Sequence, residues 1–237
     1  MISVVVTTYN STTLHHCLEG FRRQTKAPAF EVVVVNDGGK RPELEPAGLD
    51  LKIVDLDPPS SNFRLAESRN LGAATSRYDH LVFTDQDCIP APDFLYRHAQ
   101  RTQGLTAGCR RRLPLGTTPK WPLEDLPWRA DDRLMAWRAT DPEQEQIRLC
   151  FGCNLGLPRR LFNLVGGFDA GFVGWGFEDL DFAARLYRRW VTLAFDPRIA
   201  VYHLDHPVGP ERDGLQVEAN RARYLRSARQ ALQRQLI

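Results

Sequence analysis

Two carboxylates stand one residue apart directly after a short apolar segment. The run from His80 to Phe83 is typical of a buried strand, and Asp85 and Asp87 follow it. Ligands bind at the carboxyl ends of strands in open α/β sheets. Two acids placed there repel each other unless a cation or a basic side chain lies between them, and their oxygens suit Mg²⁺ or Mn²⁺. The pair favours a metal–diphosphate site, although a strand end with a plain turn would contain the same residues.

The segments upstream of this pair predict the sheet that would position it. Residues 2–7 form an apolar, β-branched run, as expected of a strand that is buried on both faces. A helical pattern and a run of valines follow, and such a β-α-β unit implies parallel strands with a right-handed crossover. The predicted elements are strands at 2–7, 31–35 and 51–56, helices at 12–24 and 65–74, and an irregular loop at 40–50.

Downstream of Asp87 the pattern is less regular. It predicts a turn at 89–93, a helix at 94–103, a strand at 104–109, a helix at 178–190 and strands at 192–196 and 199–203. Residues 212–237 suggest one or two amphipathic helical turns that dock on the domain, although a basic helix can also rest on an anionic membrane surface. The apolar face would hold Leu215, Ala222, Leu225 and Leu232, and the outer face Arg221, Arg223, Arg226, Arg229 and Arg234.

A long stretch from residue 110 to about residue 145 shows little periodicity. Within a compact domain, such a segment indicates a functional or mobile loop. Its arginine triplet, Arg110-Arg111-Arg112, could attract an anionic acceptor or a lipid headgroup, but we expect a solvated face. Its tryptophans either form a platform for a sugar or an acceptor, or pin the loop to the core. These tryptophans are Trp121, Trp128 and Trp137.

The totals are those of an ordinary globular protein. The 237 residues fit one domain or a domain with a subdomain, and a net charge of +2 is too small to imply a nucleic-acid partner. No apolar run is long enough to span a membrane, and the first residues do not resemble a signal peptide. The five scattered cysteines do not suggest a disulfide framework. We therefore expect a cytoplasmic protein, and we interpret Cys150 and Cys153 as small apolar residues rather than a zinc or redox pair.

Four segments in order resemble the nucleotide-sugar-binding half of a family 2 glycosyltransferase of the GT-A type. They are residues 4–10, 34–38, 68–72 and 83–87, and each ends a strand or opens a helix. The resemblance implies an α/β fold with a mixed, mostly parallel sheet flanked by helices, in one domain with an acceptor-side loop and helices. It implies a nucleotide-sugar-binding half at 1–103, an acceptor and catalytic half at 104–210 with a strand feeding a helix at 154–160, and a basic helix at 211–237. No Gly-x-Gly-x-x-Gly follows the first strand, which argues against a dinucleotide-binding fold.

The resemblance also assigns a donor pocket. Thr7, Thr8 and Tyr9 would line the nucleotide, and Asp37 would accept a hydrogen bond from the base, in particular from the imide N–H of uracil. On the residues alone, Tyr9 could simply pack and Asp37 could belong to a plain turn. The remaining donor-binding residues would be Arg69, Asn70, Asp85, Gln86 and Trp175.

The run from Gly174 to Asp179 is similar to the C-terminal part of galactosyltransferase-like members of the family. Its glycines allow a tight turn close to a ligand, so that Trp175 would present a rigid face to the sugar. Glu178 and Asp179 would open a helix, whose dipole would lower their pKa and keep at least one of them ionised. The resemblance makes Asp179 the general base and Glu178 the group that orients the acceptor, and the two could exchange roles. A capped helix with acids in its first turn is the alternative.

The same resemblance gives the metal ligands. His203 would join Asp87 and Asp85, with His206 as the substitute ligand. Imidazole suits Mn²⁺ better than Mg²⁺, so Mn²⁺ is the first expectation for the cofactor and Mg²⁺ the second. The ion would stabilise the diphosphate leaving group.

The predicted function is metal-dependent, inverting transfer of a Gal-, GalNAc- or Glc-type sugar from a UDP-sugar to a hydroxyl of a glycan, glycolipid or other acceptor. One alternative is a sugar nucleotidyltransferase, which would carry a Gly-rich basic loop where Thr8 to Ser11 stand. The other is a relative that binds a sugar nucleotide without transferring it. We expect no nucleic-acid partner and no transmembrane segment, and peripheral contact with a membrane stays open.

Overall fold

The structure is a computed structural model, and it describes residues 1–9, 12–58, 60, 62–131, 142–207 and 214–235. Side chains are described for these residues except 142–143 and 228–235. Trp137, one of the three tryptophans of the long loop, lies outside the described residues, as do the side chains of Arg229, Leu232 and Arg234. No helix within the described ranges combines the length and the apolar character needed to cross a bilayer.

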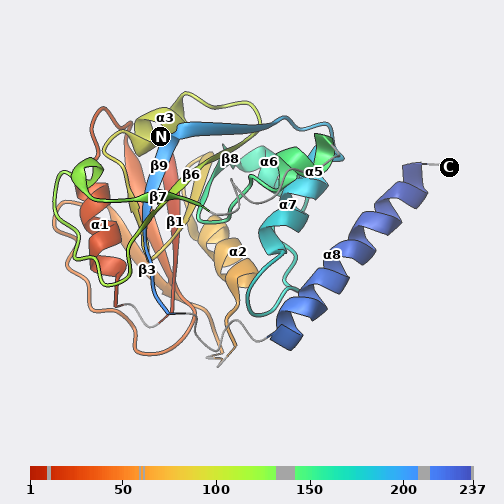
Figure 1. The fold of residues 1–237 in the computed structure, drawn as a ribbon, viewed down its shortest axis with the longest axis horizontal. Helices are drawn as coiled ribbons and strands as arrows, with labels where there is room; N and C mark the ends of the chain where they lie inside the picture. The colour runs from red at the N-terminus through yellow and green to blue at the C-terminus, as the bar shows by residue number, and fades with distance from the viewer. Residues whose placement is uncertain (10–11, 59, 61, 132–141, 208–213, 236–237) are drawn as a thin grey trace.

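One sheet runs through the described chain, with helices on both of its faces (Figure 1). Its strand order is β3-β2-β1-β4-β8-β6-β9-β5, and β7 pairs with β6. The first four strands in this order are parallel. They are β1 (Ile2–Thr8), β2 (Phe30–Asn36), β3 (Leu51–Asp55) and β4 (His80–Asp85).

The second half of the sheet is mixed. β8 is antiparallel to β4 and β6, whereas β9 is parallel to β6 and antiparallel to β5. This arrangement confirms the predicted single domain with a mixed, mostly parallel sheet flanked by helices. The strands are β5 (Cys88–Pro90), β6 (Leu105–Leu113), β7 (Arg129–Ala130), β8 (Asn154–Pro158) and β9 (Leu193–Leu204).

The valines of β1 explain why helices cover both faces. Every residue of β1 is buried, and alternate side chains of a strand point to opposite faces. Val5 belongs to one core cluster with residues of α2, and Val4 belongs to another with residues of α1. The helices are α1 (Leu14–Arg22), α2 (Leu65–Thr75), α3 (Phe94–Ala99), α5 (Pro142–Ile147), α6 (Arg159–Leu164), α7 (Glu178–Tyr187) and α8 (Gly214–Gln235), with a 3₁₀ turn η1 at Leu123–Asp125.

The prediction of two strands at 192–196 and 199–203 is wrong, because β9 continues through Pro197. The register against β6 shifts between Gly108 and Cys109, whose partners are Asp196 and Ala200. This irregularity sets Pro197 outside the ladder, where its missing N–H costs no hydrogen bond. The predicted turn at 89–93 begins later than expected, because Cys88–Pro90 pairs with β9 as β5.

The arginine triplet does not form the solvated face that we expected. All three residues lie on β6, and each is bound to a partner. Arg110 forms an ion pair with Asp131, and Arg112 forms one with Asp205. The Arg111 guanidinium lies 4.7 Å from the ring centre of Trp128 and 5.3 Å from that of Tyr202. The sequence could not show that β6 lies between acidic and aromatic neighbours.

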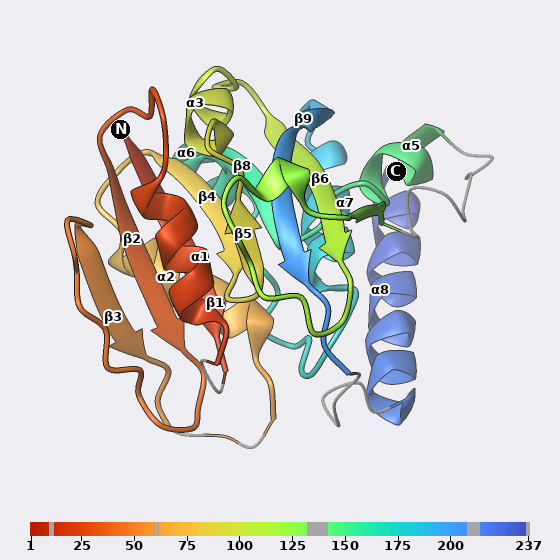
Figure 2. The same ribbon diagram turned by 60° about the vertical axis from the view of Figure 1, so that its left-hand side comes forward.

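The C-terminal segment forms a helix whose apolar face differs from the predicted one. α8 is a continuous helix of 22 residues that lies beside α7 (Figures 1 and 2); it falls within the predicted basic helix at 211–237 and is longer than the one or two amphipathic turns that the local pattern suggested. Leu215, placed on the predicted apolar face, is 83% exposed, and Leu225 is 44% exposed. The buried side chains of α8 include Asn220 and Tyr224. Over the described side chains, the buried face of the helix therefore holds Asn220 and Tyr224 rather than Leu215 and Leu225.

Candidate active site

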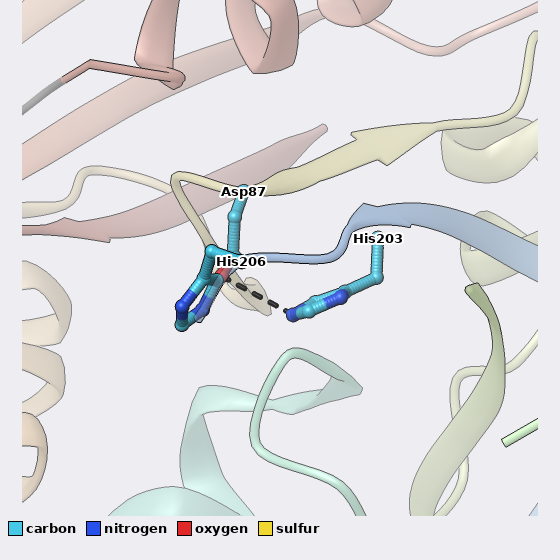
Figure 3. A group of neighbouring side chains, drawn as sticks. All are labelled: Asp87, His203 and His206. Carbon is cyan, nitrogen blue, oxygen red and sulfur yellow. Dashed lines mark ion pairs between the residues drawn. The ribbon is translucent and has the colours of Figure 1, made fainter. Parts of the chain in front are cut away.

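Asp87 and two histidines form a compact group at the sheet edge (Figure 3). Asp87 follows β4, His203 is near the end of β9, and His206 lies just beyond it. Nε2 of His203 lies 3.2 Å from Oδ2 of Asp87, and Nε2 of His206 lies 3.3 Å from the same oxygen. One ligand atom from each residue lies within 4.8 Å of the others, so one ion could contact all three.

The hydrogen bonds of the two rings show why a cation fits this group. Nδ1 of His203 is 3.0 Å from Oδ1 of Asp205, and Nδ1 of His206 is 2.9 Å from the carbonyl oxygen of Pro207. Both oxygens can only accept, so Nδ1 donates in each ring. Neutral rings would then aim two Nε2 lone pairs at a carboxylate of Asp87. Such an arrangement needs positive charge between the groups, supplied either by protons or by a metal ion.

Asp205 orients His203 from behind. Its Oδ1 also accepts a hydrogen bond of 2.9 Å from Nε of Arg112, and its Oδ2 lies 3.4 Å from Nη2 of Arg129. Burial alone would raise the pKa of Asp205, but the hydrogen bonds from Arg112 and His203 outweigh it and lower the pKa. An ionised carboxylate behind a histidine fixes its ring and increases its basicity as a ligand. Arg112 of the triplet therefore supports the histidine group.

Asp85 lies outside this group. Its Oδ1 accepts hydrogen bonds from Oγ1 of Thr7 at 2.8 Å and from Nη2 of Arg69 at 3.2 Å. The structure thus brings His206, the substitute ligand of the sequence prediction, next to Asp87, and it connects Asp85 to the helix α2 instead. Direct metal binding by Asp85 stays a prediction.

A cavity of about 220 Å³ lies between β4, β6 and the start of α7. Predicted site residues from three distant segments line it, namely Arg69, Asp85 and, within residues 175–179, Trp175 and the Glu178–Asp179 pair. Its full lining is Leu65, Arg69, Asp85, Arg110, Phe151, Gly152, Cys153, Trp175, Gly176, Phe177, Glu178, Asp179 and Leu180.

Arg69 is not the solvated helix residue that the sequence left possible. It is 1% exposed, and its Nη1 donates to Oε1 of Glu178 at 2.9 Å while its Nη2 contacts Asp85. Gly152 leaves room for it, because a Cβ at Gly152 would lie 2.5 Å from Nη2 of Arg69. Burial would lower the pKa of Arg69, but Asp85 and Glu178 outweigh it and raise the pKa. This fixed cation joins the strand that carries Asp85 to the helix that carries Glu178.

The pKa of Glu178 is shifted in the opposite direction to the one expected from the helix dipole. Burial and the neighbouring charge of Asp179 raise the pKa of Glu178 to about 7, although Arg69 acts in the opposite direction. Its side chain is almost fully buried, and its Oε2 has no hydrogen-bond partner among the described residues. Desolvation of a charge exceeds the small stabilisation that a helix N-terminus supplies. Glu178 can therefore gain and lose a proton near neutral pH.

Asp179 is held by backbone groups. Its Oδ2 accepts from the N–H of Gly152 at 3.1 Å, and its Oδ1 accepts from the N–H of Leu180 at 2.8 Å. The residue is 8% exposed and lines the cavity. A carboxylate accepts more than two hydrogen bonds, so Asp179 keeps the capacity to contact a hydroxyl group.

The Gly-Trp-Gly turn has an unusual backbone. Gly174, Gly176 and Phe177 have φ angles of 73°, 98° and 73°, in the left-handed region. For Phe177 this conformation costs about 1–2 kcal/mol, because its Cβ crowds the following carbonyl. A side chain at Gly174 or Gly176 would add similar strain. The turn places Trp175 on the cavity wall and starts α7 directly at Glu178.

Asp37 and Tyr9, two of the residues predicted to contact the nucleotide, form a set of contacts separate from the cavity. Asp37 is 1% exposed, and both of its oxygens accept hydrogen bonds from Arg64, one from Nε at 2.8 Å and one from the backbone N–H. Tyr9 lies over Gly38, and its ring packs edge to face on Phe63 at 5.8 Å. The predicted contact of Asp37 with the nucleotide base stays a prediction. A buried acid needs a cationic partner, and Arg64 is that partner for Asp37.

The other donor-pocket residues hold strand ends and helices together. Thr8 donates through Oγ1 to Gln86, and Nε2 of Gln86 donates to the carbonyl of Tyr9 at 2.9 Å. Asn70 exchanges two hydrogen bonds of 2.8 Å with the backbone of Phe168 and does not line the cavity. These contacts neither require nor exclude the predicted contact with a nucleotide.

Sequence analysis missed several residues of the site. Arg110 was assigned to a solvated face but lines the cavity, and Arg64 was not considered. The need of a buried acid for a cation could have pointed to Arg64, whereas no local signal distinguishes Arg110 within its triplet. Cys150 and Cys153 are free and buried, as expected of small apolar residues.

Comparison with known proteins decides the family. Residues 3–165 match glycosyl transferase family 2, and residues 139–207 match the N-terminal domain of galactosyltransferase. The chain belongs to glycosyl transferase family 2. The first match covers more than half of the chain, and the second covers the segment with the Gly-Trp-Gly turn and His203. The two matches together therefore cover the residues of both regions of the candidate active site.

Individual relatives agree with this membership. The chain is 30% identical over 222 residues to validoxylamine A glucosyltransferase of Streptomyces hygroscopicus subsp. limoneus, an alignment that covers 81% of this chain and 49% of the relative. It therefore spans about half the length of that relative.

Solved structures of low identity share the fold. GalNAc-T7 with UDP, GalNAc and Mn²⁺ matches with a TM-score of 0.66 and 17% identity over 95% of this chain and 47% of the other. S. aureus TarS 1-349 with UDP-GlcNAc matches with a TM-score of 0.63 and 18% identity over 89% and 60%. These GT-A structures establish the likeness of the fold.

Proposed function

We propose that this chain catalyses metal-dependent, inverting transfer of a Gal-, GalNAc- or Glc-type sugar from a UDP-sugar to an acceptor hydroxyl. The supporting observation is the separation of two kinds of charged group at one edge of the sheet. Asp87 lies among histidines, which suits a cation. Glu178 lies beside Asp179 on a cavity wall, which suits proton transfer. Family membership gives this pair of regions its chemical meaning.

In the proposed donor site, Asp87, His203 and His206 would hold Mn²⁺ or Mg²⁺. When bound, the ion supplies positive charge that stabilises the diphosphate leaving group. Asp37 would accept a hydrogen bond from the uracil imide beside Tyr9, since its carboxylate has capacity beyond the two bonds from Arg64. GalNAc-T7 is found with UDP and TarS with UDP-GlcNAc, and these uridine nucleotides motivate this choice of base.

In the proposed acceptor site, Asp179 takes the proton from the attacking hydroxyl. Glu178 is engaged by Arg69 through Oε1, and its Oε2, which has no hydrogen-bond partner among the described residues, is suited to orient the acceptor by accepting a hydrogen bond from another of its hydroxyl groups. Trp175 would cover the sugar from the cavity wall, where a rigid aromatic face excludes water. Attack opposite the diphosphate inverts the anomeric carbon without a covalent intermediate on the protein.

A panel of nucleotide sugars tests the proposal directly. The purified chain is incubated with UDP-Gal, UDP-GalNAc, UDP-Glc and GDP-mannose, with Mn²⁺ or with a chelator, and release of the nucleotide is measured with and without sugar acceptors. We expect release from a UDP-sugar that stops with the chelator. Release of pyrophosphate from UTP and a sugar phosphate would instead identify a nucleotidyltransferase. Binding without release from any donor would indicate a non-catalytic relative.

A further inference from the structure

α8 carries a buried polar side chain whose donor group is committed to the Gly-Trp-Gly turn. Asn220 is 2% exposed. Its Nδ2 donates to the carbonyl oxygen of Val173 at 2.8 Å and to that of Trp175 at 3.3 Å, and its Oδ1 lies 3.3 Å from Nε2 of Gln216. A buried amide satisfied in this way is costly to replace, because two carbonyl groups would lose their donor.

Two neighbours of Asn220 on α8 contact the same region. Arg223 donates from Nε and Nη2 to the two oxygens of Asp169, at 2.8 and 2.9 Å. The ring of Tyr224, which is 6% exposed, lies 5.9 Å from the ring of Phe177. Through these contacts, α8 reaches both the segment before the turn and Phe177, the residue just before α7. Figures 1 and 2 both show α8 beside α7.

The opposite side of the turn is held by the nucleotide half of the chain. The N–H of Gly174 donates to the carbonyl of Phe63 at 2.7 Å, and Arg64 forms an isolated parallel bridge with Gly174. Arg64 is the residue that binds both oxygens of Asp37. The turn is thus held between two supports, one next to Asp37 and one on α8.

We propose that α8 positions the catalytic turn and that Asn220 is the main positioning residue. The inference rests on the proposed function, since it deepens the role of the Trp175 turn in transfer. A turn with three left-handed residues is not held by regular hydrogen bonding, so contacts from outside set its place. Because α7 starts at the end of this turn, the same contacts set where Trp175 and Asp179 stand relative to the donor. Asn220 itself does not line the cavity.

Hydrogen exchange and kinetics on one set of variants test this role. The variants are Asn220→Leu, which matches the size of the amide, and Asn220→Asp, which removes the donor and keeps a polar group. Leu215→Ala on the exposed side of α8 is the matched control. In the free protein we expect the amide of Gly174 to exchange faster only in the Asn220 variants. The test needs only one of the two Asn220 variants to be folded, which is shown by cooperative thermal melting like that of the control.

In the same variants we expect kcat to fall about 10- to 100-fold, as misplacement of reacting groups by about an ångström does. The dissociation constant for UDP with Mn²⁺ should stay within about twofold, since UDP lacks the sugar that Trp175 would cover and the hydrogen bonds of Asn220 go to none of the proposed metal ligands. In a Trp175→Ala background, Asn220→Leu should cause little further loss of kcat, because both changes act through one turn.

The outcomes separate this inference from the proposed function. If the wild type releases nucleotide from no donor, the proposed function fails, and the exchange data alone still decide whether Asn220 holds the turn. Unchanged exchange at Gly174 overturns the positioning role. Faster exchange with unchanged kcat, or full additivity with Trp175→Ala, also overturns it.

Discussion

Asp87, which is partly buried, and Glu178, which is almost fully buried, are two carboxylates of one site whose pKa values are shifted in opposite directions. Burial would raise the pKa of Asp87, but His203 and His206 outweigh it, and the pKa lies well below its usual range. For Glu178, burial and Asp179 act together, and Arg69 offsets them only in part, so the pKa rises to about 7. The difference comes from the neighbours rather than from the depth of burial.

This contrast suggests a division of labour. A carboxylate that is ionised at every physiological pH keeps its oxygens available for a cation. A carboxylate whose pKa lies near neutrality can gain or lose a proton when a substrate hydroxyl binds or when a neighbouring acid changes its charge. The two regions also differ in construction, because Asp87 has partners from one neighbouring strand end, whereas Glu178 depends on α2 and on the turn held by α8.

The largest effect is expected from the carboxylate pair. Asp179→Asn removes the proposed base without changing its size, and turnover should fall about 10²- to 10⁴-fold. Binding of UDP with Mn²⁺, measured by calorimetric titration, should be preserved. Asp93→Asn, which alters a carboxylate paired with Arg97 elsewhere on the domain, is the control. Normal turnover in Asp179→Asn would transfer the base role to Glu178.

Asp87→Asn tests the histidine region. The loss of a charged ligand should weaken Mn²⁺-dependent binding of UDP by about 100-fold or more, since second-layer changes alone cost about 10- to 100-fold. Calorimetry with and without a chelator measures this loss. Unchanged titrations would rule out Asp87 as a ligand, and the same experiment on Asp85→Asn decides whether Asp85 also binds the ion.

Asp205→Asn should have a smaller effect on the same measurement. The change keeps an acceptor oxygen near His203 but removes the charge that orients its ring, so affinity for Mn²⁺ should fall about tenfold. Arg112→Gln removes a donor to Asp205, and it should lower the affinity for Mn²⁺ by a smaller factor than Asp205→Asn does. Identical affinity in Asp205→Asn would show that the histidine needs no orienting acid.

The smallest and most diagnostic effect concerns pH. In the wild type, loss of the Glu178 proton leaves a carboxylate that can accept a hydrogen bond from the acceptor, so turnover should rise with a midpoint near pH 7. Glu178→Gln should be slower by about tenfold and flat through that range. Turnover is followed between pH 5.5 and 8.5 under saturating donor (a range set around the pKa by about 1.5 units on each side). A rise that persists in Glu178→Gln would assign the titration to another group.

Local patterns predicted the first half of the fold well. The valine runs of β1 and β2 and the segment that ends at Asp85 are strong signals. The observed strand Ile2–Thr8 is one residue longer than predicted at one end, and Phe30–Asn36 is one residue longer at each end. The second half was harder, because β9 reads as two short strands around Pro197. Only its pairing with β6 across a register shift makes it one strand. Ladder partners far along the chain are not visible in a local pattern.

Side-chain partners were the least predictable feature. The triplet at Arg110 and the helix α8 were both assigned faces from their local composition; the first assignment was wrong, and the second was wrong for the apolar face at Leu215 and Leu225, although Arg221 and Arg226 are exposed as predicted. The Arg111 guanidinium lies close to two aromatic rings, and α8 contacts the turn through Asn220. A polar residue is buried when a matching group waits for it, and that group comes from another segment.

The sequence by itself determined the family and the order of the site segments. Acids and histidines at strand ends follow from local patterns, and the carboxyl ends of strands converge in any sheet of this kind. Tertiary structure alone decided that His206 lies next to Asp87 and His203, that Asp85 bonds to Thr7 and Arg69, and that the pKa of Glu178 rises to about 7. It also decided which helix holds the Gly-Trp-Gly turn. The physical reason is that charge and hydrogen bonding act over a few ångströms, and only folding brings groups a hundred residues apart to that distance.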